Sequence, residues 1–186
     1  MMITPASAQD VLTTAGNAQF EIATGNNGGV ASPGYFRGWP HLCIRQCVGE
    51  ACDAPCEANT VYNTNGAAAV SVLAGQGYVM EMKNLAGLSV RRHVFAPQAG
   101  QADADKFLRY VDELTNDGNA PATVMVRLGS VGADGPRLSD GAERIWKTSS
   151  DDSNFESTDR WLAVDDNSAA GGLPTTGVLF QGAGNR

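Results

Sequence analysis

Apolar and polar residues alternate along several stretches of the chain. The alternation is clearest over 18–23, 77–83, 88–95 and 122–128, and in the last of these Val124, Val126 and Leu128 share one side. Because successive side chains of a strand point to opposite faces of a sheet, this period predicts strands with one buried face. Further strands, bounded by Gly or Asn turns, are predicted at 60–63, 67–73, 144–147, 160–164 and 177–181.

One charged residue interrupts the pattern of the predicted strand 88–95. Arg92 falls on the same side as Val90 and Val94, where every other residue is apolar. A charge is costly to bury. We therefore expect this strand to end near the rim of its sheet.

The stretch 102–114 is ambiguous, because its apolar residues fall at helical spacing. It leads through Thr115-Asn116-Asp117-Gly118 into the alternating stretch 122–128, as one arm of a hairpin would. A similar Thr-Asn-x-Gly pattern precedes an alternating stretch near 63–75. We predict a strand at 107–115 that pairs with 122–128 through a turn at 116–119, with helix confined to about 101–106.

The predicted elements indicate a mostly β protein, an antiparallel β-sandwich of Ig-like or jelly-roll-like type over 59–186. Residues 1–58 are expected to form a separate part, a Gly- and Asn-rich arm followed by a cysteine-stapled loop. The first forty residues hold too few apolar side chains to offset the entropy of ordering them. An extended arm over 13–31 would suit donation of a strand to a neighbouring molecule.

Five short segments have a familiar sequence pattern: 61–66 (Val-Tyr-Asn-Thr-Asn-Gly), 94–97 (Val-Phe-Ala-Pro), 114–130, 145–151 and 159–161. Through them the stretch 59–184 resembles the Ig-like β-sandwich modules of large bacterial secreted and cell-surface proteins. The resemblance implies a two-sheet sandwich, an exported location and a structural or adhesive role. It brings no catalytic motif, and the cysteines lie outside it.

The four cysteines Cys43, Cys47, Cys52 and Cys56 have the spacing C-x3-C-x4-C-x3-C. Two disulfides, a four-thiolate zinc site and an iron–sulfur cluster are the open interpretations. Neither half has the C-x2-C turn of common zinc sites, and ferredoxin spacing is absent. The even number and the suspected exported context favour disulfides, with three pairings open.

The charge and the motifs exclude several classes of function. A net charge of −7 with scattered basic residues argues against nucleic acid, and no apolar run approaches the 18 or so residues of a membrane span. The chain has no G-x-S-x-G, H-E-x-x-H or Walker motif, and His41 and His93 are its only histidines. We expect no catalysis. Ala6-Ser7-Ala8 has the form of a signal-peptide cleavage site, in keeping with export.

Two groups of residues are candidate binding sites. Trp39, Trp146 and Trp161 could offer flat faces to a carbohydrate, although a large aromatic residue in a small sandwich is commonly core. Asp151, Asp152, Glu156 and Asp159 supply hard oxygen ligands for Ca²⁺, without EF-hand spacing; a solvated acidic loop is the alternative.

The sequence thus predicts a non-enzymatic extracellular or cell-surface module with a structural or adhesive role, acting by self-association or within a larger surface assembly. Two alternatives stay open. One is a phage virion protein, such as a capsid decoration or tail component. The other is the carbohydrate-binding module of a carbohydrate-active enzyme.

Overall fold

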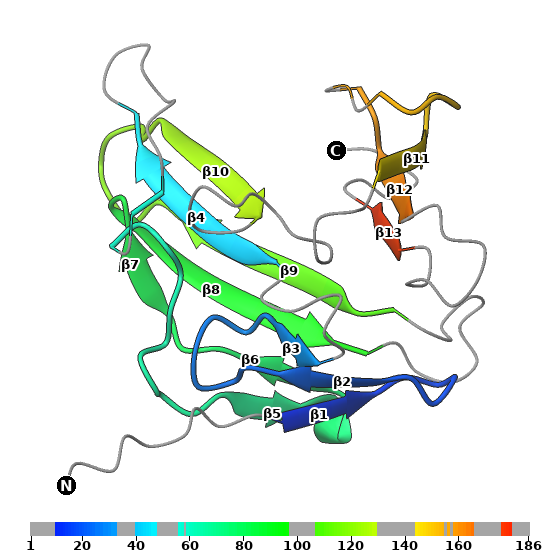
Figure 1. Cartoon of the computed structure of the whole chain (residues 1–186). Coiled ribbons are helices and arrows are strands. Elements are labelled where there is room, and N and C mark those ends of the chain that lie inside the picture. The colour runs from blue at the N-terminus through cyan, green and yellow to red at the C-terminus, as the bar shows by residue number, and fades with distance from the viewer. Residues whose placement is uncertain are drawn as a thin grey trace, which may run out of the picture. The chain divides into compact units, whose positions relative to one another are not determined.

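In the part of the chain that the structure describes, the protein is built from short antiparallel strands with almost no helix (Figure 1). The computed structural model describes residues 10–32, 40–47, 56–57, 59–96, 107–129, 144–154, 156, 158–165 and 176–179. The chain divides into two compact units, 1–136 and 137–186. The predicted mostly β, antiparallel class is confirmed.

The first unit holds three sheets. Its elements are β1 (Asp10–Thr13), β2 (Gln19–Ile22), β3 (Val30–Ser32), β4 (His41–Gln46), β5 (Val70–Val72), the 3₁₀ turn η2 (Leu73–Gly75), β6 (Gly77–Val79), β7 (Lys83–Leu85), β8 (Leu88–Phe95), β9 (Arg109–Thr115) and β10 (Val124–Gly129). The strand orders are β1-β2-β3, β10-β4 and β5-β6-β8-β7, with β9 also paired to β8. Because β9 pairs with β8 along most of its length, β6 and β7 share the opposite edge of β8.

A single hydrophobic core joins the sheets of the first unit. Its buried side chains are Leu12, Phe20, Ile22, Val30, Leu42, Ile44, Tyr62, Met80, Leu85, Leu88, Val90, Val94 and Ala96. Residues before 59 thus share a core with residues after it. The two compact units meet at 136/137 along the sequence, and the boundary expected after residue 58 stays a prediction.

The Gly- and Asn-rich segment near the N-terminus is folded, so the expectation of an extended arm over 13–31 is wrong. β1, β2 and β3 pair with one another. The turn between β2 and β3 is closed by backbone hydrogen bonds, including Ala23 N–H to the Gly29 carbonyl at 2.9 Å. The side chain of Asn27 also accepts the Gly29 N–H at 2.8 Å. Gly and Asn serve here as turn residues between very short strands, which bury Leu12, Phe20, Ile22 and Val30 in the core and leave Val11 exposed.

The predicted strands 88–95 and 107–115 are confirmed, but the predicted hairpin of 107–115 with 122–128 is wrong. β9 pairs with β8, and β10 pairs with β4. The turn chemistry is present, since the Asn116 side chain accepts the Gly118 N–H at 3.0 Å and donates to the Ala120 carbonyl at 2.8 Å. That turn carries the chain from one sheet to another. The helix expected near 101–106 lies outside the described residues.

The second unit is described by one three-stranded antiparallel sheet in the order β11-β12-β13. Its strands are β11 (Arg144–Thr148), β12 (Trp161–Asp165) and β13 (Thr176–Leu179). The register shifts between Ile145 and Lys147, so Trp146 has no partner in the ladder and forms a bulge. These strands agree with those predicted at 144–147, 160–164 and 177–181.

Within the described residues, no helix has the length and the apolar character needed to cross a membrane.

Candidate functional site

A fully buried arginine lies on β8, in the core of the first unit. Arg92 has 0% exposed surface, and its Nε and Nη2 donate to the two carboxylate oxygens of Asp112 on β9, at 2.7 and 2.9 Å. Nη1 donates to the carbonyl of Asn27 at 3.0 Å and to that of Pro40. The expectation that Arg92 marks a rim of the sheet is therefore wrong, because ion pairing and backbone carbonyls satisfy its charge inside the core.

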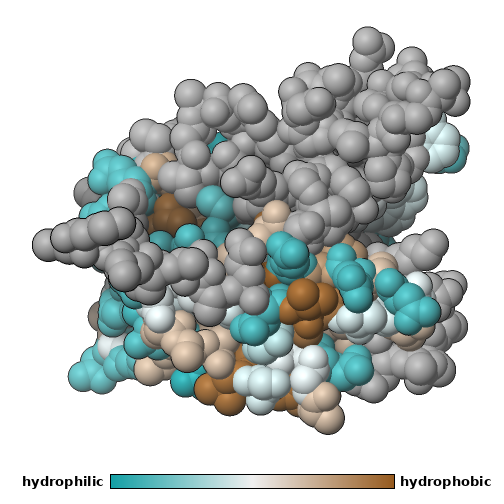
Figure 2. Space-filling view, turned by 60° about the horizontal axis from the view of Figure 1, so that its bottom comes forward, coloured by the Kyte–Doolittle hydropathy of each residue, from teal (hydrophilic) through white to brown (hydrophobic). Residues whose placement is uncertain are grey.

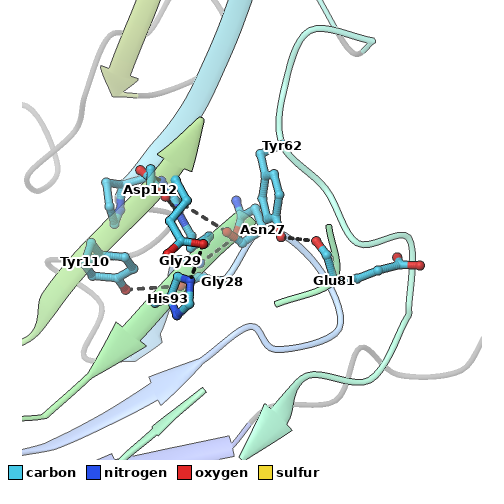
Figure 3. A network of polar contacts seen from close by, with 11 residues as sticks. Asn27, Gly28, Gly29, Tyr62, Glu81, His93, Tyr110 and Asp112 are labelled. Atoms are coloured by element: carbon cyan, nitrogen blue, oxygen red, sulfur yellow. Dashed lines mark hydrogen bonds and ion pairs between the residues drawn. The ribbon is translucent and has the colours of Figure 1, made fainter. Parts of the chain in front are cut away.

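Two tyrosines and a glycine complete this network, which Figure 3 shows around Asp112 and Asn27. The guanidinium lies 5.3 Å from the ring centre of Tyr110 and 5.9 Å from that of Tyr62. Tyr110 donates to the Gly28 carbonyl at 3.1 Å, and Tyr62 donates to the Glu81 carbonyl. The network thus ties the β2–β3 turn to β8 and β9 and to Pro40, the residue that precedes β4.

The chemistry of the network is that of a structural brace. Burial raises the pKa of Tyr62 to about 12 and also raises that of Tyr110, so both hydroxyls stay protonated. The Asp112 carboxylate is bound to Arg92 by two hydrogen bonds. None of these groups is left over to serve as an acid, a base or a nucleophile.

The histidines form no catalytic pair within the described residues. Burial, and then the charge of Arg92, lower the pKa of His41 from 6.5. His93 Nε2 lies 3.1 Å from a carboxylate oxygen of Glu113, an ion-pair distance without hydrogen-bond geometry.

Cys43 and Cys56 form a disulfide with an S–S distance of 2.04 Å, and Cys47 is disulfide-bonded as well. Sulfurs joined in this way are not thiolate ligands, so the predicted disulfide is confirmed for Cys43 and Cys56. Cys52 lies outside the described residues. The bridge joins residue 56 to β4. On the same strand, Ile44 donates its N–H to the Thr60 carbonyl at 2.9 Å.

The predicted calcium residues lie in the loop between β11 and β12, where Asp159 organises the chain. Its carboxylate accepts the Glu156 N–H at 2.8 Å and the hydroxyls of Ser149 and Ser150, both at 2.9 Å. These bonds, the first of them most strongly, lower the pKa of Asp159 to about 2.

The other acidic side chains of this loop have partners within the chain or lie in solvent. Asp151 pairs with Lys147, Asp152 accepts the Thr148 hydroxyl at 3.0 Å, and Glu156 is exposed. Among the residues that the structure describes, no group of three or more His, Cys, Asp or Glu side chains is placed to hold a metal ion. Calcium at this loop stays a prediction.

The predicted carbohydrate residues fall in two places. Trp146, in the bulge of β11, is 65% exposed, and Trp161 on β12 is half-buried. Leu162 and its partner Thr148 are buried, so they mark the inner face, and Trp161 belongs to the opposite one. Trp39 lies outside the described residues.

One edge of β10 has no partner strand among the described residues. Cys47 N–H donates to the Thr123 carbonyl at 3.0 Å, so these residues form a hydrogen-bonded antiparallel pair, and the register repeats this at Met125 and Arg127. Residues that alternate with these pairs point their N–H and C=O groups away from the partner strand. The N–H and C=O groups of Val124, Val126 and Leu128 therefore point away from β4, and we name this row the β10 edge.

The opposite edge of β4 agrees with this assignment. Ile44 N–H donates to the Thr60 carbonyl at 2.9 Å, and the Leu42 carbonyl accepts the Tyr62 N–H at 2.8 Å. The even-numbered residues of β4 thus bond to the segment 60–62, and its odd-numbered residues bond to β10. Among the described residues, β10 pairs with β4 alone.

The side chains of the β10 edge lie on the same face of the sheet as the core residues of β4, but they are exposed to solvent. Val126 lies opposite Ile44 and Leu128 opposite Leu42, and both partners have 0% exposure. Val126 and Leu128 are themselves 49% and 44% exposed. The apolar face that is closed at β4 is therefore uncovered one strand further on.

Other elements also carry exposed apolar side chains, among them Met82, Val111 and Trp146. Val11, Val70 and Leu73 are exposed on β1, β5 and η2, but the face shown in Figure 2 carries its apolar residues as spots among hydrophilic ones. Single exposed apolar residues are usual on soluble proteins. The β10 edge differs because its apolar side chains and its unpaired backbone groups lie together.

Comparisons of the chain with protein-family models, with curated proteins and with solved structures found no match. The alternation at 122–128 predicts a strand with one apolar side. The sequence carried no signal that this strand ends a sheet, because that depends on its pairing with β4.

Proposed function

We propose that the protein is a non-enzymatic structural or adhesive module that joins a larger assembly outside the reducing cytosol. The observation that carries this proposal is the β10 edge. Soluble β proteins usually protect an edge strand with charges, Pro or bulges, and an unprotected edge pairs readily with another strand. β10 has Arg127 as its only charged residue, whereas β9, also paired on one side, carries Arg109, Asp112 and Glu113.

The location rests on the cysteines. The Cys43–Cys56 disulfide suits an oxidising compartment, and cytosolic proteins rarely keep such bonds. The fold that we propose is an Ig-like or jelly-roll-like sandwich. It is supported by antiparallel sheets that share one core.

The absence of catalysis is supported by the way the buried polar groups are used. Arg92, Asp112 and Tyr110 bond to one another or to backbone carbonyls. A catalytic group must instead be free to exchange a proton or to attack a substrate.

The proposal is tested by light scattering of the full oxidised chain at rising concentration. We expect a mass above that of one chain, and the change Val126→Pro should return it to that of one chain. Proline at 126 removes an N–H that points away from β4, so the fold should survive. Arg127→Pro is the matched control, because it removes an N–H directed at Cys43 and should lower stability. A single-chain mass at every concentration would contradict assembly through this edge.

Carbohydrate binding is a second candidate, favoured by the exposure of Trp146. An exposed indole offers a flat apolar face to a sugar ring, and Lys147 and Asp151 beside it supply polar groups. Titration with a panel of oligosaccharides, followed by tryptophan fluorescence, tests this. Binding that Trp146→Ala removes and Trp146→Phe keeps would support the site; an unchanged spectrum with every sugar would exclude it.

A further inference from the structure

We propose that the β10 edge pairs antiparallel with the β10 edge of a second copy, about a two-fold axis at Val126. This inference rests on the proposed function and names the partner. The pairing would join two β4–β10 sheets into one continuous four-stranded sheet.

The backbone limits the registers that such a pair can adopt. Only Val124, Val126 and Leu128 direct their N–H and C=O groups outward, so hydrogen-bonded pairs must join two of these residues. With the axis at Val126, this residue bonds to its own copy, and Val124 bonds to Leu128 on both sides of the axis. All three residues are then satisfied in each chain.

The side chains select this register from its two neighbours. An axis at Arg127 would set that arginine opposite its copy, and like charges directly opposite are unfavourable. An axis at Met125 would pair Val124 with Val126 and leave Leu128 opposite Ala122. The axis at Val126 instead places Arg127 opposite Met125, and the row of Val124, Val126 and Leu128 meets the same row of its partner.

The charges of the chain favour an edge-to-edge contact at this strand. Two copies with a net charge of −7 repel each other, so contact is least costly where acidic residues are absent. β10 contains no acidic residue. β9 is less suitable, because it carries two acidic residues, Asp112 and the exposed Glu113.

A charge pair at one position tests the register. In the proposed dimer Met125 faces Arg127 of the second copy twice, so Met125→Glu should tighten the dimer and Met125→Lys should weaken it. Cross-strand charge pairs of this kind make a difference in Kd on the order of tenfold between the two variants. Arg45 faces Met125 within the same chain in monomer and dimer alike, so its effect on Kd cancels.

Net charge alone predicts the opposite order. Met125→Glu makes the chain more negative and Met125→Lys makes it less negative, so general repulsion would weaken the first dimer and tighten the second. Sedimentation equilibrium of wild type and both variants, with circular dichroism as the control for folding, gives the three Kd values. A tighter Glu variant and a weaker Lys variant support the proposal.

Other outcomes overturn it in separable ways. If both variants weaken a dimer that Val126→Pro abolishes, the axis lies at Met125 and the register is wrong, while the proposed function stands. The order set by net charge means that β10 does not face β10. No change overturns the register at Val126, because an axis at Arg127 would place Met125 opposite Gly129. A wild-type chain that stays monomeric at every concentration removes both this inference and the proposed self-assembly.

Discussion

Arg92 and Asp112 face each other across the β8–β9 pair, and two hydrogen bonds join them inside the core. The arginine belongs to a strand of otherwise apolar buried residues, and the aspartate to a strand that is largely exposed. The pair therefore fixes β9 to β8 at a point where few apolar contacts do so. It also holds the carbonyls of Asn27 and Pro40 around one guanidinium.

Removal of the aspartate should strongly destabilise the protein. Asp112→Ala leaves the guanidinium of Arg92 buried without its counter-charge, and loss of one partner of a buried pair costs about 3–5 kcal/mol. Glu113→Ala is the control, since this neighbouring residue points to the other face and pairs with His93 at the surface, which is worth about 0–1 kcal/mol. Urea unfolding followed by circular dichroism measures both. Equal losses would show that Arg92 does not depend on Asp112.

Gly28 should be less tolerant of alanine than Gly66. Both have positive φ, +68° and +87°, and each would incur the strain of a left-handed alanine, about 1–2 kcal/mol. A Cβ at Gly28 would in addition lie 3.1 Å from Met80 and 3.2 Å from Arg92, whereas at Gly66 it would meet nothing. Thermal unfolding of Gly28→Ala and Gly66→Ala compares them. We expect the larger loss at Gly28, and similar losses would mean that Arg92 and Met80 move aside freely.

Loss of the Cys43–Cys56 bridge should weaken the fold without abolishing it. The bonded residues are 13 positions apart, and a closed loop of about 15 residues contributes about 3 kcal/mol by chain entropy. The double change Cys43→Ala with Cys56→Ala is preferable to a reductant, because Cys47 is disulfide-bonded too. We expect a lower urea midpoint and an unchanged β spectrum. An unfolded variant would show that the bridge, and not the core, holds β4.

His41 should make the protein less stable in mild acid. Its pKa is lowered in the folded state from 6.5, so below that pH the unfolded chain binds more protons than the folded one. The free energy of unfolding should therefore fall as the pH drops through 6.5, and level off below the folded-state pKa. Unfolding of wild type and His41→Gln between about pH 7.5 and 5.5 isolates this effect, because other groups titrate in both. Parallel pH profiles would contradict it.

The sequence allowed prediction of individual strands better than of their partners. The alternation over 88–95 placed Arg92 on the buried side correctly. Nothing in that segment shows that an aspartate of another strand lies opposite it. Asp112 meets Arg92 only because β9 pairs with β8, and that pairing is not written in either strand alone. The signal for the short strands near the N-terminus was weak, because the Gly and Asn residues of their turns outnumber the four apolar residues that reach the core.

The same limits apply to the candidate site. The even number of cysteines was sufficient to favour oxidation. The apolar row of Val124, Val126 and Leu128 was also visible, but its exposure was not. That exposure results from the end of a sheet, which is a property of strand order and not of any one segment.

The pairing of β4 with β10 also has a consequence for synthesis. β4 leaves the ribosome early, but its partner β10 is the last described strand of the first unit, so β4 lacks this partner until most of that unit has been made. At about 5–20 residues per second this wait lasts several seconds. During that interval the backbone N–H and C=O groups of Cys43 and Arg45 have no partner from β10. The β10 segment of another newly made chain can pair with them instead. Chains made side by side on one polysome would then exchange β10 strands. Slower translation between β4 and β10 should increase the yield of such strand-swapped dimers.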